Sequence, residues 1–89
     1  MTDHELAEQL LAVVNPSGDD VLEGAIRAGE DAAAIIDLVE QAAIRRVRLS
    51  QVLVDAVADF ADDAALDRDD IAAIREDLAK LRAANSVLR

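Results

Sequence analysis

Aliphatic side chains recur at steps of three and four residues along this chain, most regularly over residues 71–89. This spacing lines one face of an α-helix, whereas a half-buried β-strand requires apolar and polar residues in alternation. No segment shows that alternation. The sequence therefore predicts an all-α fold, a small helical bundle whose helices bury their apolar faces against one another.

The first eighteen residues predict a short helix and a turn. Thr2 and Glu5 have the spacing of a capping box, which satisfies free N–H groups in the first turn of a helix. The segment 15–18, Asn-Pro-Ser-Gly, ends this helix because proline disfavours helical geometry in the residue before it. A second short helix then begins with Asp19 or Asp20 as its cap.

Residues 31–61 contain neither glycine nor proline and predict one long central helix. We expect a break before it at Gly29, a typical C-terminal cap, and the alternative is a helix that runs through this glycine. Two apolar stripes follow the long helix: Ala32, Ile36, Val39, Ala43, Val47, Ser50, Val54 and Val57, and Ile35, Leu38, Ala42, Leu49, Val52, Ala56 and Phe60. One neighbouring helix would not cover both, so we expect a partner molecule to cover the rest.

The C-terminal helix follows an aspartate-rich turn and is capped by Asp67. We expect residues 1–89 to form a single domain with three parts: an N-terminal helix and turn (1–18), a short helix plus the long helix (19–61), and an amphipathic helix (67–89). The chain is only slightly longer than the roughly 70–80 residues below which a lone core gives marginal stability.

The C-terminal helix carries a coiled-coil seam, whose core positions are Ile71, Ile74, Leu78, Leu81, Asn85 and Leu88. In a parallel dimer Asp70 would face Arg75 of the second copy, and Asp77 would face Arg82 in the same way. Asn85 would pair with its counterpart and set the register. The alternative is a helix that packs within its own chain, since the same spacing is expected there.

The formal net charge of −10 is unevenly distributed. Residues 1–44 hold ten acidic residues and one basic residue, whereas residues 45–89 hold nine acidic and eight basic residues. The acidic half should repel nucleic acids and anionic lipids, so we expect neither as a partner. An acidic surface is also a common means of keeping a protein soluble.

The chain has no cysteine, which excludes disulfides and thiolate metal sites. Charges interrupt every apolar run well before the roughly 20 residues that span a bilayer. The first residues lack the basic and apolar regions of a secretory signal. We therefore expect a cytoplasmic location without membrane contact.

Arg45, Arg46 and Arg48 form a cluster midway along the chain. On a continuous helix Arg45 and Arg48 share one side, while Arg46 points away. The cluster is a candidate docking point for a carboxylate or phosphate of a partner. The alternative is that it neutralises the acidic surface of the same chain.

The run from Ala25 through Gly29 to Ile35 resembles the spacing of helix-turn-helix motifs. That resemblance implies a recognition helix starting near Asp31, yet the side chains there are small, apolar or acidic. Reading bases and binding phosphates require arginine, lysine, asparagine or glutamine. We therefore favour a tight turn between packed helices over DNA binding.

Other chemistry is sparse. His4 has no second histidine or cysteine to share a transition metal with, and the aspartates around residue 63 lack the EF-hand pattern. The four hydroxyl residues have no evident activating base, so we expect no catalytic residue, cofactor or metal.

These patterns predict a non-enzymatic protein–protein interaction module: a small acidic adaptor, regulator or assembly factor that self-associates as a homodimer and docks a protein partner. One alternative is an acidic nucleic-acid mimic that inhibits a basic DNA-binding protein, although the arginines interrupt its row of carboxylates. A helix-turn-helix regulator is the remaining alternative.

Overall fold

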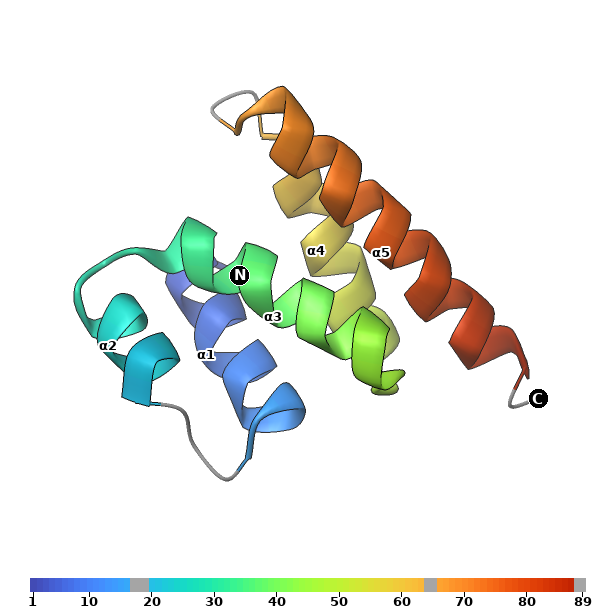
Figure 1. The fold of residues 1–89 in the computed structure, drawn as a ribbon, viewed down its shortest axis with the longest axis horizontal. Helices are drawn as coiled ribbons and strands as arrows, with labels where there is room; N and C mark the ends of the chain where they lie inside the picture. The colour runs from blue at the N-terminus through green and yellow to red at the C-terminus, as the bar shows by residue number, and fades with distance from the viewer. Residues whose placement is uncertain (17–19, 64–65, 88–89) are drawn as a thin grey trace.

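Five helices follow one another in the computed structural model, which describes residues 1–16, 20–63 and 66–87 (Figure 1). They are α1 (Asp3–Val14), α2 (Asp20–Arg27), α3 (Asp31–Arg45), α4 (Gln51–Ala61) and α5 (Arg68–Val87). The described residues contain no strand, so the prediction of an all-α fold is confirmed. The predicted seam position Leu88 lies outside the described residues.

The start of α1 confirms Thr2 as the predicted N-cap, although the Glu5 carboxylate accepts from the Thr2 hydroxyl rather than from the Thr2 N–H of a full capping box. The Thr2 hydroxyl oxygen accepts a hydrogen bond from the Glu5 N–H at 3.1 Å, and the hydroxyl group lies 3.2 Å from the Glu5 carboxylate. The helix ends at Val14, two residues before Pro16. Local side-chain chemistry therefore sets both ends of this helix.

Gly29 separates α2 from α3, as the sequence predicted. Its φ of +83° lies in the left-handed region, which glycine adopts without a steric penalty. The Glu30 N–H donates to the Ala25 carbonyl at 2.9 Å, and the Gly29 N–H donates to the Ile26 carbonyl at 3.1 Å. These two bonds form a Schellman motif, which satisfies the last carbonyls of α2.

The prediction of one long helix over residues 31–61 is wrong, because α3 ends at Arg45 and α4 begins at Gln51. A second Schellman motif ends α3: the Val47 N–H donates to the Ala42 carbonyl at 2.9 Å, and Arg46 takes the left-handed position with φ 54°. Ser50 then caps α4 by accepting a hydrogen bond from the Leu53 N–H at 3.3 Å.

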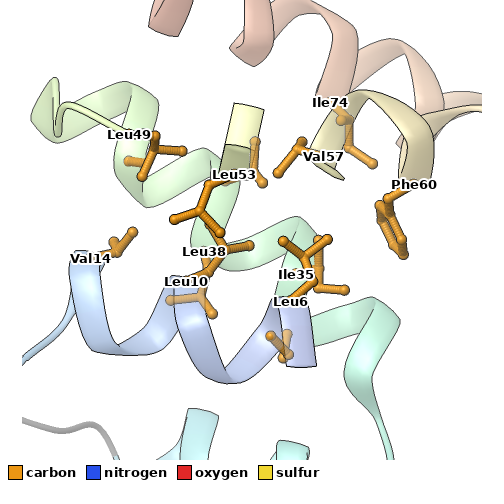
Figure 2. Packing of buried hydrophobic residues seen from close by; sticks show 14 of the residues in the cluster. Leu6, Leu10, Val14, Ile35, Leu38, Leu49, Leu53, Val57, Phe60 and Ile74 are labelled. Carbon is orange, nitrogen blue, oxygen red and sulfur yellow. The ribbon is translucent and has the colours of Figure 1, made fainter. Parts of the chain in front are cut away.

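Burial of both apolar stripes is the physical reason for this break. A straight helix would leave one stripe in water, whereas a chain that turns at residues 46–50 brings α4 back against α1 and α5. Leu38 and Phe60, one from each end of the second stripe, then lie in the same core, which is drawn in Figure 2. The apolar surface that we expected a partner molecule to cover is thus largely buried within one chain.

The core gathers side chains from all five helices, with α3 packed against α1, α2 and α5. In Figure 1, α1, α2 and α3 form one group, while α4 and α5 form an antiparallel hairpin beside it. Among the described residues no polar or charged side chain is buried in this core. Nor does any helix of the described residues combine the length and apolar character that crossing a bilayer requires.

Candidate functional site

The seam of α5 faces the interior of its own chain. Ile74, Leu78 and Leu81 are 1%, 3% and 1% exposed, and α5 packs against α3 and α4. This is the intrachain alternative that the heptad spacing left open. The same side chains cannot meet a second copy while this packing persists.

The polar seam residues also have intrachain surroundings. The Asn85 Nδ2 group donates to the Leu49 carbonyl at 3.3 Å, and its Oδ1 atom is buried without a partner among the described residues. The Arg75 Nη2 atom lies 3.3 Å from the carboxylate oxygen Oδ1 of Asp62, in the turn before α5. Asp70 and Arg82, the remaining charges expected at a dimer interface, have no ion pair within the described part of the chain.

Asp77 lies in acidic surroundings within its own chain. Burial raises the pKa of its carboxyl group above the ordinary value, Lys80 partly offsets this rise, and Glu40 and Glu76 add to it. Within one chain, therefore, the charges that act on Asp77 are those of Lys80, Glu40 and Glu76, and not that of the arginine that the heptad pattern suggested.

The arginine cluster lies at the turn between α3 and α4. Because α3 ends at Arg45, the expected sharing of one helix side by Arg45 and Arg48 does not apply. The Arg45 Nη1 group donates to the Val14 carbonyl at 3.0 Å, so this side chain links the ends of α3 and α1. Arg46 and Arg48 are exposed and make no side-chain hydrogen bond or ion pair with any described residue.

Two large, exposed aliphatic residues precede and follow this cluster along the chain. Ile44 is 71% exposed and Val52 is 66% exposed. We call Arg45, Arg46 and Arg48 with these two residues the arginine turn. Arginine beside apolar side chains is enriched in protein–protein interfaces, where the guanidinium binds carboxylates and its stem covers apolar surface. The sequence identified the arginines, but the prediction of a continuous helix placed Val52 on an apolar stripe rather than in solvent.

Arg46 occupies a position that favours glycine. Its φ of 54° and ψ of 43° place a non-glycine residue in the left-handed region, which costs roughly 1–2 kcal/mol for an L-residue. At the equivalent position after α2 the chain has Gly29. Arginine therefore occupies a backbone conformation that favours glycine. Backbone strain of this kind is common at functional sites.

A hollow of about 330 Å³ lies at the opposite end of α1 and α4, and we call it the acidic hollow. Its lining combines three carboxylates with apolar side chains: Met1, Asp3, Leu6, Ala56, Asp59, Phe60 and Asp63. The hollow lies where α1 begins and α4 ends, while the arginine turn lies where α1 ends and α4 begins. The sequence offered no signal for it, because its residues come from segments about fifty positions apart.

His4 joins α1 to the start of α3. Its Nδ1 atom lies 3.0 Å from the Asp31 carboxylate, and its Nε2 atom lies 2.8 Å from the Glu8 carboxylate. The hydrogen bond with Asp31 raises the pKa of the imidazole above 6.5. Desolvation opposes this rise, and the charges of Asp31, Glu8 and Glu5 add to it. Among the described residues no three ligating side chains are placed to hold a metal ion.

The α2–Gly29–α3 unit has the form of a helix-turn-helix, but its second helix is unsuited to entering a DNA groove. α3 packs against three other helices, and Ile35, Leu38 and Val39 are fully buried. The exposed side chains of α3 include Asp37 and Glu40, which would repel phosphates. This geometry supports a structural role for the turn.

Comparison with known proteins finds no matching family model, no matching curated protein and no matching solved structure.

Proposed function

We propose that this chain is a non-enzymatic protein–protein interaction module that docks an acidic, partly apolar segment of a partner through the arginine turn. The proposal rests on the exposure of Arg46 and Arg48 and on their lack of an internal partner among the described residues. Both residues are exposed, and neither side chain makes a hydrogen bond or ion pair with a described residue, although acidic residues greatly outnumber basic ones. Charges retained without an internal partner are available to an external one.

The chemistry of this surface favours a protein segment over a nucleic acid. A net charge of −10 repels a long polyanion at every approach. A short helix with a few carboxylates is repelled much less, and its apolar side chains can cover Ile44 and Val52. Arginine can bind each carboxylate in a bidentate manner.

Fluorescence anisotropy with a synthetic peptide tests this proposal. The peptide is an amphipathic helix with leucine and glutamate on one face, and a second peptide carries glutamine in place of glutamate. We expect the acidic peptide to bind the wild-type protein more tightly than the neutral one. The Arg46→Gln/Arg48→Gln variant should bind it at least about tenfold more weakly, since interface arginines often contribute more than 1.4 kcal/mol.

Arg68→Gln/Arg82→Gln is the matched control, because it removes the same charge from exposed positions on α5. This control should bind the acidic peptide as the wild type does. Equal weakening in both variants would assign the effect to net charge and would contradict a docking role for the arginine turn.

A further inference from the structure

We infer that the arginine turn docks into the acidic hollow of a second copy, so that copies of this chain associate head to tail. This inference rests on the proposed function, because it names the partner of the same surface. The arginine turn combines arginines with exposed aliphatic side chains, and the acidic hollow is lined by carboxylates and apolar side chains. The two surfaces are complementary in charge and in apolar character.

The two surfaces cannot meet within one chain. They lie at opposite ends of α1 and α4, and the eleven residues of α4 alone span about 16 Å. Arg45 is held at its own end by the Val14 carbonyl, 3.0 Å from its Nη1 atom. Contact between the arginine turn and the acidic hollow therefore requires two copies.

The hollow has a size that suits side chains. Its volume of about 330 Å³ lies at the lower end of small-molecule pockets, which range over roughly 300–1,000 Å³. An arginine can lay its aliphatic stem along the floor near Phe60 and keep its guanidinium at the rim beside Asp3 and Asp59. An exposed aliphatic residue of the arginine turn, such as Ile44, supplies further apolar contact.

One residue at each surface is unfavourable for its own helix. Arg46 occupies the left-handed position after α3, where glycine is preferred. Asp59 lies in the last turn of α4, which contains no basic residue, and a carboxylate there opposes the helix dipole. Conflicts between a residue and its local structure are expected where function selects the residue.

The resulting contact joins two different surfaces, so it differs from the twofold dimer that the seam pattern predicted. A contact of this type adds copies in one direction and gives open chains, unless the rotation between copies closes a ring. We therefore expect assemblies larger than dimers at high concentration.

Sedimentation velocity with two variants tests the inference. Arg46→Gly/Arg48→Gln disables the arginine turn, and Asp59→Arg disables the acidic hollow. Both variants should fold, because each change suits the local helix. We expect the assemblies of the wild type to exceed the size of a dimer as its concentration rises. Each variant alone should associate only at a protein concentration at least about tenfold higher. An equimolar mixture should form a one-to-one dimer that grows no further, since each variant keeps one intact surface.

Charge-matched changes elsewhere serve as controls. Arg68→Gln/Arg82→Gln and Asp55→Arg make the same changes in net charge on exposed positions, and both should associate as the wild type does. A wild type that stays monomeric at every concentration, controls that weaken association equally, or a mixture that forms no dimer would overturn the inference. The proposed function would still stand if the monomeric wild type binds the acidic peptide through the arginine turn.

Discussion

The Asn85 side chain donates a hydrogen bond to the Leu49 carbonyl at 3.3 Å, and this bond ties the last turns of α5 to the segment between α3 and α4. The segment contains no regular backbone hydrogen bonding at Leu49, whose side chain is buried in the core. Asn85 therefore holds the turn that carries the arginines against the C-terminal helix.

Replacement of this amide by a carboxylate should destabilise the fold at neutral pH. In Asn85→Asp an oxygen replaces the Nδ2 donor and faces the Leu49 carbonyl, which should lower the free energy of unfolding by about 1–3 kcal/mol. Asn85→Ala should lower the free energy of unfolding by about 1 kcal/mol. Acidification should restore stability only in the Asp variant, because a protonated carboxyl group can donate. Urea denaturation at pH 7 and pH 4 measures both effects, and equal losses at both pH values would contradict this prediction.

Leu78 tests whether the seam packs within one chain. Its side chain is 3% exposed, so Leu78→Ala should lower the free energy of unfolding by about 2–5 kcal/mol. Because the packing is intrachain, the difference in Tm between wild type and variant should be the same at every protein concentration. The exposed neighbour Lys80→Ala is the control and should change stability by less than about 0.5 kcal/mol. A difference that shrinks on dilution would indicate that the seam pairs between copies.

Gly24, inside α2, and Gly29, after its end, should respond in opposite directions to substitution by alanine. Gly24 lies inside α2 and a Cβ atom there would meet nothing within 4 Å, so Gly24→Ala should raise the free energy of unfolding by about 0.5–1 kcal/mol. Gly29 has φ +83°, and Gly29→Ala should lower it by about 1–2 kcal/mol. Thermal unfolding of the two variants measures this contrast, and a loss of stability in both would show that α2 needs flexibility at Gly24.

His4 should make stability depend on pH near neutrality. Contact with Asp31 raises its folded-state pKa above 6.5, so the folded protein binds a proton more tightly than the unfolded chain. The stabilisation is complete below about pH 6.5 and is lost as the pH rises through the folded-state pKa. The Tm of His4→Gln should fall below that of the wild type at pH 5.5 and approach it at pH 8.5.

A proton NMR titration provides the direct measurement, because the chain has one histidine. Asp31→Asn should shift the His4 pKa towards 6.5, whereas Asp37→Asn, which changes a carboxylate of α3 without contact to the ring, should leave it unchanged. An equal shift in both variants would attribute the raised pKa to general charge.

The helical class, the bounds of α1 and the break at Gly29 could all be predicted from local sequence patterns. These features depend on neighbours in the chain: the Thr2 hydroxyl reaches the Glu5 N–H, and Gly29 supplies a positive φ. The turn at Arg46 could not be found in the same way, because no glycine or proline marks it. Ser50, which caps α4, was assigned to an apolar stripe of the predicted long helix, because a single serine is a weak signal for a helix start.

The covering of the apolar stripes and the positions of the candidate surfaces depend instead on how the helices pack. A helical pattern states which side chains share a face, but it does not state which molecule covers that face. The turn at residues 46–50 brings most residues of both stripes into one core, and the seam of α5 faces the same core. It also leaves Ile44 and Val52 in solvent beside the arginines. The acidic hollow arises because the start of α1 meets the end of α4, a contact between distant segments that packing alone establishes.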